Sequence, residues 1–396
     1  MRQLWRTLRE DMSMEHKRPL RIMQIIARMN VGGPAVIVAE LMQGLDLLSF
    51  EMQLVTGYCS EDEADYLDEL ALDIPVIRVT GLGRNISTLG DIRSFFTLLH
   101  LIREFQPDII HTHTIKAGVL GRIAGLIVYP KSKRIHTFHG HLLHGYFSPI
   151  KTKLIVLIEK YLAYFCSTLI AIGNQVKDDL LNARVGKPDQ YSVIFPGLDK
   201  LDTQSKESAR IQLGLDHEKT YVSFVGRLTQ IKRPDRLIEI ARYLKVNHPK
   251  VELLVAGAGE KFIELQELAN QDALPIIFLG WRNDIGRILS ASDTAILCSD
   301  NEGIPLTLIQ ASQAGLPIIS TNVGSVSDIV VDGETGLLTE NNTQSLIRSL
   351  DELLLNPLKM NQFGMAGKSR AEALFSLKGM IRAHEKLYSQ VIEGIN

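Results

Sequence analysis

Short apolar runs alternate with amphipathic helical patterns along most of the 396-residue chain. This alternation is typical of parallel β-sheets built from β-α-β units. Seven strands are predicted in the first half, at residues 20–26, 51–56, 74–79, 109–111, 134–138, 168–172 and 191–194. Six more are predicted in the second half, at residues 221–225, 252–256, 275–279, 294–298, 317–320 and 336–338. The pattern therefore predicts an α/β protein with two doubly wound, Rossmann-like domains.

The predicted domain limits follow the interruptions of this pattern. Residues 1–19 mix charges with scattered apolar residues and are predicted to be an N-terminal extension. Residues 199–219 are polar, so they are predicted to link a first domain at 20–198 to a second at 220–374. Residues 375–396 carry apolar residues at helical spacing and predict a C-terminal helix.

Composition narrows the class of protein. The chain is 45% hydrophobic and 22% charged, which is typical of a globular protein, and its net charge of −2 gives no case for nucleic-acid binding. Cys59, Cys166 and Cys298 lie far apart and form no CxxC pair. This spacing argues against a disulfide framework or a cysteine zinc site and favours a reducing cytoplasm.

The sequence predicts neither a signal peptide nor a membrane-spanning helix. The N-terminal residues lack the continuous apolar core and the cleavage site of a signal peptide. The most lipid-like segment, residues 153–172, is interrupted by Glu159 and Lys160. It is expected to form a buried helix at 151–165 followed by a buried strand.

The turns that follow strands carry the candidate chemistry, because ligands of open parallel sheets bind beyond the carboxyl ends of the strands. Gly32 and Gly33 follow the first strand and lead into a predicted helix at 36–45, where backbone N–H groups can approach an anion. A simple tight turn is the alternative. Arg227 and Lys232 follow the strand at 221–225, where two cations can stabilise a diphosphate, and a solvated basic loop is the alternative.

The most informative turn begins at Ser299 and reads Ser-Asp-Asn-Glu-Gly-Ile-Pro-Leu-Thr-Leu-Ile-Gln. Pro305 suits the first turn of a helix, so Glu302 and Gly303 should lie in the loop just before it. An acidic cap at a helix N-terminus is the alternative interpretation, favourable by about 0.3–1 kcal/mol.

Together these turns resemble the donor-sugar signature of the retaining family 4 glycosyltransferases. The resemblance implies the GT-B fold, with two Rossmann-like domains facing across a cleft and a C-terminal helix crossing back to the first. It implies a hexosyltransferase that moves a sugar from a nucleotide sugar, expected to be a UDP-sugar, to a hydroxyl in surface-polysaccharide or lipid-linked glycan synthesis. The family usually has two glutamates with seven residues between them; here they are Glu302 and Gln310.

The resemblance also implies the site residues. The catalytic set is Glu302 on the donor-sugar hydroxyls, Arg227 and Lys232 on the diphosphate, and His139 between donor and acceptor. Gln310 would keep a neutral hydrogen bond to the ribose in place of a charge-assisted one, at a cost of about 1 kcal/mol. The other expected donor-binding residues are Gly33, Gly226, Gly257, Trp281, Arg282, Gly303, Ile304 and Leu306. The expected acceptor-side residues are Gly32, His113, Lys116, His139 and His141.

No cofactor or metal is expected, because fixed cations would replace a metal and the nucleotide sugar is a substrate. Zinc is an alternative role for His111, His113, His139 and His141, which form two pairs at alternate positions, but no nearby Asp, Glu or Cys completes a ligand set. Residues 116–160 carry eight basic residues and one acidic residue, Glu159. That excess favours an anionic acceptor, such as a lipid-diphosphate glycan, and peripheral contact with the inner face of the plasma membrane. A solvated basic face is the alternative.

Two other functions are compatible with these residues. A sugar-nucleotide epimerase on the same fold would need the donor site but no acceptor. A catalytically silent partner in a glycan-assembly complex is suggested by Gln310 in place of the family's second glutamate.

Overall fold

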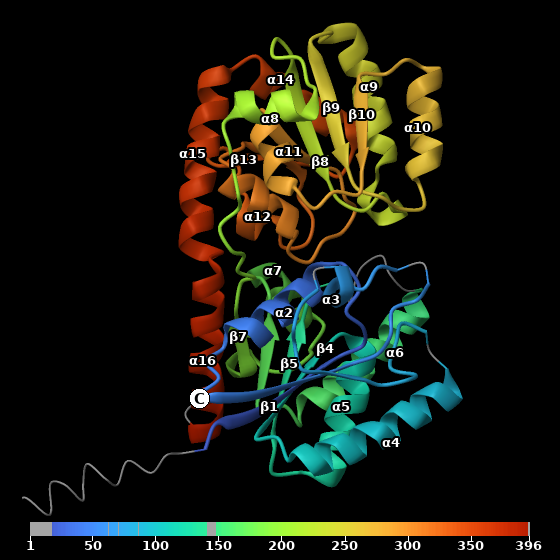
Figure 1. The fold of residues 1–396 in the computed structure, drawn as a ribbon, viewed down its shortest axis with the longest axis vertical. Helices are drawn as coiled ribbons and strands as arrows, with labels where there is room; N and C mark the ends of the chain where they lie inside the picture. Colours follow the sequence, from blue (N-terminus) through green and yellow to red (C-terminus); the bar gives the residue numbers. More distant parts are fainter. Residues whose placement is uncertain (1–17, 62, 70, 86, 141–147, 395–396) are drawn as a thin grey trace, which may run out of the picture. The chain divides into compact units, whose positions relative to one another are not determined.

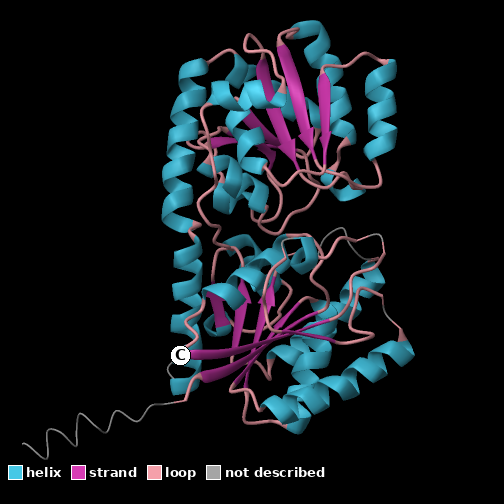
Figure 2. Ribbon diagram, viewed as in Figure 1, coloured by secondary structure: helices cyan, strands magenta, loops and turns pink. Residues whose placement is uncertain are grey.

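The computed structural model describes residues 18–61, 63–69, 71–85, 87–140 and 148–394. It contains two open β-sheets, each flanked by helices (Figures 1 and 2). The chain divides into two compact units. The first takes its residues from Met1–His136, Phe165–Ser167 and Tyr388–Asn396, and the second from Thr137–Tyr164 and Thr168–Leu387.

The first sheet has seven strands in the order β3-β2-β1-β4-β5-β6-β7. They are β1 (Leu20–Ile26), β2 (Phe50–Thr56), β3 (Val76–Arg78), β4 (Ile109–His113), β5 (Lys133–Phe138), β6 (Thr168–Ala171) and β7 (Tyr191–Val193). β1 pairs in parallel with both β2 and β4. The accompanying helices are α2 (Gly33–Gly44), α3 (Tyr66–Glu69), α4 (Thr88–Phe105), α5 (Ile115–Val128), α6 (Pro149–Ala163), α7 (Asn174–Asn182) and the short η1 (Pro188–Gln190).

The second sheet has six parallel strands in the order β10-β9-β8-β11-β12-β13. They are β8 (Thr220–Val225), β9 (Val251–Ala256), β10 (Ile276–Gly280), β11 (Thr294–Leu297), β12 (Ile318–Thr321) and β13 (Gly336–Thr339). The helices are α8 (Lys206–Leu213), η2 (Gln230–Lys232), α9 (Asp235–Asn247), α10 (Phe262–Gln271), α11 (Ile285–Ala291), α12 (Leu306–Gln313), α13 (Val326–Ile329), α14 (Thr343–Leu354), α15 (Pro357–Leu374) and α16 (Leu377–Glu393). All thirteen predicted strands are confirmed, with ends shifted by at most two residues.

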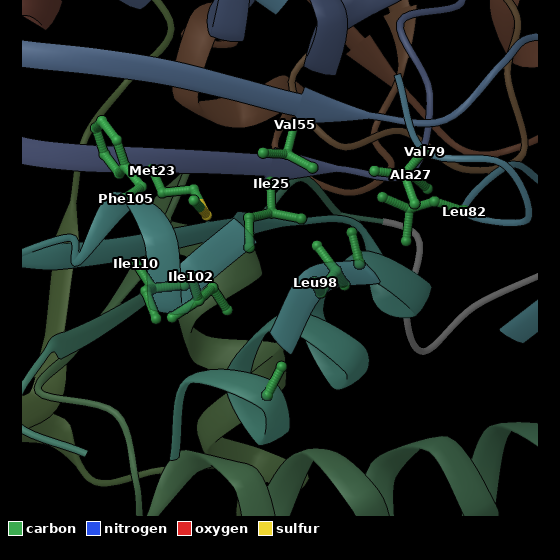
Figure 3. Close-up of a cluster of buried hydrophobic side chains, with 12 residues drawn as sticks. Met23, Ile25, Ala27, Val55, Val79, Leu82, Leu98, Ile102, Phe105 and Ile110 are labelled. Carbon is green, nitrogen blue, oxygen red and sulfur yellow. The ribbon is translucent and has the colours of Figure 1, made fainter. Parts of the chain in front are cut away.

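Alternate residues of β1 build the core of the first unit. Met23 and Ile25 are fully buried and point toward α4, where they meet Leu98 and Ile102 (Figure 3). Because the sheet is buried on both of its faces, the strand sequence is nearly continuous in apolar residues.

The opposite face of β1 carries a buried polar network that fixes the end of α16. Gln24 lies beside His111 in the register of β1 with β4. The Gln24 Nε2 donates to the Tyr388 hydroxyl at 3.0 Å, and His111 Nδ1 lies 2.8 Å from the same oxygen. Buried polar groups need such partners, so the network specifies where the last turns of α16 pack. The predicted return of the C-terminal helix to the first sheet is thereby confirmed.

Two helices differ from the sequence expectation. The helix predicted at 36–45 begins at Gly33, because Pro34 occupies one of its first positions, where its missing N–H costs nothing. The predicted linker at 199–219 contains α8. Ser205 caps this helix through its side chain, Gly214 ends it in the left-handed conformation, and its Ala209 packs into the core of the second unit.

Helix α6 is buried on one face only. Leu162 is 3% exposed, whereas Leu154 and Leu157 are 57% and 64% exposed. None of the described helices is long and apolar enough to cross a membrane.

Replacing Tyr388 by Phe should lower the free energy of unfolding by about 1–2 kcal/mol, because the buried Gln24 amide loses an acceptor. Urea unfolding followed by circular dichroism measures this. The matched control is Tyr164→Phe, at a residue that is 76% exposed. Equal midpoints for the two variants would show that the Tyr388 hydroxyl contributes no stability.

Candidate active site

The candidate site lies where the strand order of the second sheet reverses. β8 and β11 are neighbours, with Thr294 opposite Val222, while the strands that follow them in sequence lie on opposite sides. Ligands of such sheets bind beyond the carboxyl ends at this switch point. The turns after β8 and β11 meet there, and the Asp300 amide donates to the Ile231 carbonyl at 2.9 Å.

The two turns are joined by an ion pair. Lys232 Nζ lies 2.5 Å from Glu302 Oε1, and the Ser299 hydroxyl donates to the same oxygen at 2.5 Å. The side chain of Glu302 is only 4% exposed and that of Lys232 is 18% exposed. Burying a carboxylate costs several kcal/mol unless charge and hydrogen bonds compensate, so the lysine and the hydroxyl hold Glu302 in place. In the described part of the chain, both hydrogen bonds to this carboxylate end on Oε1.

A buried arginine supports the turn after β11 from behind. Arg236 is 3% exposed and donates to the Cys298 carbonyl at 2.7 Å and to Asp300 Oδ1 at 2.9 Å. The Thr321 hydroxyl donates to the Ser299 carbonyl at 2.6 Å. These bonds tie the backbone on both sides of the acidic turn, so Glu302 is positioned by a rigid loop. Burial raises the pKa of Cys298 to about 12, which keeps its thiol protonated at neutral pH.

Arg227 supplies an exposed positive charge in the turn that also carries Lys232. Within the described residues, its guanidinium takes part in no hydrogen bond or ion pair, and the side chain stands in the turn after β8. Thr229, in the same turn, has a buried hydroxyl oxygen without a hydrogen-bond partner among the described residues. Arg227 therefore has all five N–H donors available for an anion.

Backbone contact brings His139 beside the acidic turn, within the second unit. A Cβ added to Gly303 would lie 2.2 Å from the His139 carbonyl oxygen. Gly140 has φ +87°, and a Cβ there would lie 2.5 Å from the Cα of Gly303. The Gly303 carbonyl accepts from the Ser325 amide at 3.0 Å. Only glycines permit this approach, which places the buried His139 next to Glu302.

Comparison with known proteins shows where this chain belongs. A model of Glycosyltransferase Family 4 matches residues 31–200, and a model of Glycosyl transferases group 1 matches residues 205–370. An Escherichia coli UDP-Gal:alpha-D-GlcNAc-diphosphoundecaprenol alpha-1,3-galactosyltransferase is 32% identical over 81% of this chain and 86% of its own length. The chain belongs to the family 4 glycosyltransferases.

Other relatives agree with this assignment. The capsular polysaccharide biosynthesis glycosyltransferase CapM of Staphylococcus aureus is 25% identical over 81% of this chain and 87% of its own. Among solved structures, HepE of Anabaena in complex with UDP and glucose has a TM-score of 0.78 at 22% identity, covering 94% of this chain and all of HepE. Sucrose-phosphate synthase of Thermosynechococcus elongatus has a TM-score of 0.80 at 20% identity, covering 95% and 100%. These neighbours show that the glycosyltransferase has the GT-B fold.

Other residues that are predicted to bind the donor lie on neighbouring turns of the second unit. Gly257 follows β9 with φ +147°, and a Cβ there would lie 1.9 Å from the Gly226 carbonyl oxygen. Trp281 follows β10 and is 50% exposed. Arg282 is paired with Asp284 at 2.6 and 2.7 Å, and this hydrogen-bonded pairing raises the pKa of Arg282 and lowers that of Asp284. Arg282 is thus engaged within its own turn.

Three predicted donor residues lie in α12 or just before it. Ile304 is buried, Leu306 is the first helical residue, and Gln310 follows one turn later with a half-buried side chain. The beginning of α12 therefore lies directly after the acidic turn. Their contacts with a donor remain a prediction.

Two predicted acceptor-side residues, Lys116 and His113, lie in the first unit and make hydrogen bonds within it. Lys116 donates to the carbonyls of Gly81 and Asn85 at 2.7 and 2.6 Å and pairs with Asp91 at 2.5 Å. His113 is fully buried, with Nε2 2.7 Å from the Gln24 side-chain oxygen. Lys116 and His113 are therefore held by partners within the first unit, and their contact with an acceptor stays a prediction. Gly32 and Gly33 begin α2 in the same unit, and His141 lies outside the described residues.

The sequence analysis assigned no role to Ser299, the first residue of the acidic turn, and did not identify Arg236. Ser299 lies two residues after the end of β11, and its only sequence signal is a hydroxyl next to the acidic Asp300. Arg236 lies among the apolar positions of α9. An arginine at a buried helical position indicates that a buried carboxylate or backbone carbonyl groups accept its hydrogen bonds. Within the described residues, no group of three or more His, Cys, Asp or Glu could hold a metal ion.

Replacing Gly303 by Ala should lower kcat/KM about 10-fold to 100-fold, because a Cβ would collide with the His139 carbonyl and shift Glu302. Steady-state transfer assays measure this. Gly367→Ala is the matched control, since its Cβ would meet only atoms 3.8 Å away. Wild-type kinetics in the Gly303 variant would refute the packing argument.

Replacing Gln310 by Glu should retain turnover and tighten donor binding about 3-fold to 10-fold, because a carboxylate accepts stronger hydrogen bonds from ribose hydroxyls. Calorimetric titration with the donor measures this. Gln271→Glu, on the exposed end of α10, controls for the added charge. Weaker binding by the Gln310 variant alone would place the ribose elsewhere.

Proposed function

We propose that this glycosyltransferase is a retaining enzyme that transfers a hexose from a UDP-sugar to a hydroxyl of a lipid-diphosphate-linked glycan, at the cytoplasmic face of the membrane. The observation that carries the proposal is the Lys232–Glu302 pair at the switch point, with Arg227 exposed in the same turn as Lys232. The similarity to the Escherichia coli galactosyltransferase, whose name specifies a UDP-sugar donor and a diphosphoundecaprenol acceptor, supports the donor and acceptor classes.

Arg227 and Lys232 would bind the diphosphate of the donor. The bond from the sugar C1 to the diphosphate oxygen breaks during transfer, and its electron pair stays on the diphosphate. Cations fixed at that position stabilise the charge more in the transition state than in the bound donor. Arg227 can form two parallel hydrogen bonds, while Lys232 acts as a compact charge on a flexible stem.

Glu302 would bind the sugar hydroxyls after an exchange of partners. In the described structure its Oε1 is held by Lys232 and Ser299. An arriving diphosphate competes for Lys232, and the sugar hydroxyls then take the place of the ammonium at the carboxylate. Ser299 keeps the carboxylate oriented while this exchange occurs.

The new bond would form on the face of the sugar that the diphosphate leaves. The acceptor oxygen bonds to C1, its proton passes to a departing diphosphate oxygen, and no enzyme nucleophile is needed. His139 lies beside Glu302 and would orient the acceptor hydroxyl. We also propose that no metal is needed, because Arg227 and Lys232 supply the positive charge.

The decisive experiment incubates the full chain with UDP-glucose, UDP-galactose or UDP-N-acetylglucosamine and a lipid-diphosphate N-acetylglucosamine acceptor, with and without EDTA. The expected product carries one added hexose in the α configuration, detected by mass spectrometry and proton NMR, and EDTA leaves the rate unchanged. A β-linked product would overturn retention, and loss of activity in EDTA would overturn metal independence. If incubation without acceptor produces a new sugar epimer, the protein is an epimerase. If it binds neither UDP-sugars nor GDP-sugars, it is a catalytically silent partner.

Replacing Arg227 by Ala should lower kcat/KM by about 10²-fold to 10³-fold, because the leaving diphosphate loses its forked donor. The same assay measures it. Arg242→Ala is the matched control, since Arg242 is an exposed arginine of α9 that pairs with Asp272. Comparable kinetics in the two variants would remove Arg227 from the site.

A further inference from the structure

Helix α7 is capped by side chains from another part of the second unit. Its own N-cap residue, Gly173, has no side chain to accept a hydrogen bond. Instead, the Asn174 amide donates to Asp328 Oδ2 at 2.8 Å, and the Asn174 side chain donates to Asp328 Oδ1 at 2.7 Å. The Val176 amide donates to the Ser325 hydroxyl oxygen at 3.4 Å. The side chains of α13 and its N-cap therefore satisfy amides that α7 leaves without a partner in its own first turn.

The fit between the start of α7 and residues 325–328 is close. A Cβ added to Gly173 would lie 2.4 Å from the Ser325 hydroxyl oxygen and 2.7 Å from Asp328 Oδ2. Asp328 is only 8% exposed, and its own carbonyl accepts from Arg370 of α15 at 2.8 Å. A buried carboxylate is tolerable only with such partners, so the Asn174 donors and Asp328 hold each other in place.

The same segment supports the acidic turn that carries Glu302. The Ser325 amide donates to the Gly303 carbonyl at 3.0 Å. Gly324 has φ +52°, and a Cβ there would lie 1.8 Å from the Glu302 carbonyl oxygen. Residues 324–328 thus contact the backbone of the acidic turn through Gly324 and Ser325, and they contact α7 through Ser325 and Asp328.

We infer that Asp328 is a positioning residue for the transfer reaction. By capping α7 it fixes Ser325, and Ser325 in turn fixes the backbone beside Glu302. Asp328 would not touch a substrate itself. Small displacements of a group that binds the reacting sugar lower the rate strongly, so a loosened α13 should be felt in catalysis. This inference rests on the proposed contact between Glu302 and the donor sugar.

A cap that only stabilises α7 is the alternative. It predicts that removal of the cap lowers the thermal midpoint and leaves the kinetics of the folded enzyme unchanged. A positioning role predicts a further effect that depends on the sugar. Transfer from a UDP-sugar should suffer, while binding of UDP alone should not, because UDP lacks the sugar that Glu302 would bind.

The test compares Asp328→Asn with the matched control Asp351→Asn. Asp351 also has two side-chain partners, the Tyr243 hydroxyl at 2.5 Å and His248 Nε2 at 2.8 Å, but it lies on α14. Asp328→Asn should lower kcat/KM for the UDP-sugar about tenfold, mainly through kcat, because its amide would meet the Asn174 amide donor to donor. Its affinity for UDP, measured by calorimetry, should match that of the wild type. The control should match the wild type in both measurements.

A double variant tests whether the hydrogen bond itself is responsible. Asp328→Asn combined with Asn174→Asp exchanges donor and acceptor, so the side-chain bond can form again. It should recover kcat/KM to within about twofold of the wild type, as expected for two residues that share one interaction.

Hydrogen exchange tests the contact without any substrate. In Asp328→Asn, the amides of Asn174, Val176 and Ser325 should exchange about tenfold faster than in the wild type, and in Asp351→Asn at the wild-type rate. A wild type that is inactive with every UDP-sugar would overturn the proposed function, whereas unchanged exchange at Ser325 would overturn the positioning role. That role is also overturned if Asp328→Asn has wild-type kinetics, if it loses UDP affinity as strongly as kcat/KM, or if the double variant recovers nothing.

Discussion

The ion pair between Lys232 and Glu302 is the interaction on which the candidate active site depends. It joins two turns that are 70 residues apart in the sequence and places a cation and a carboxylate in contact. The carboxylate is almost completely buried, and its burial is tolerable because the ammonium and the Ser299 hydroxyl both meet Oε1. The order of the strands creates the pair, because β8 and β11 must be neighbours for their turns to meet.

The same turns show how contacts within the protein hold the site in position. Arg236 and Thr321 hold the backbone around Glu302 from inside the protein, and the contact of Gly303 with His139 holds it from the other side. Arg227 is exposed, and within the described residues its guanidinium makes no hydrogen bond or ion pair. It is therefore available to bind an incoming anion. Family 4 membership and this arrangement together make positioning and charge, rather than a nucleophile, the basis of the proposed chemistry.

The sequence pattern predicted the thirteen strands well because a buried parallel strand leaves a short apolar run between turn residues. It predicted α8 poorly, since a short helix with few apolar residues resembles a polar linker even though Ser205 and Gly214 mark its ends. It could not predict the partners of Lys116 and His113 within the first unit, because Asp91 and Gln24 are distant from them in the sequence. Their contact with an acceptor stays a prediction.

By itself, the sequence determined the fold class, the strands, the family and the residue types at the two essential turns, because each leaves a local pattern of polarity, glycine and charge. The tertiary structure decided which of these residues meet. That Lys232 contacts Glu302, that Gly303 touches His139, and that the apolar residues of α6 divide into a buried and an exposed face all depend on long-range packing. Packing of that kind joins residues distant in the chain, and no local pattern encodes it.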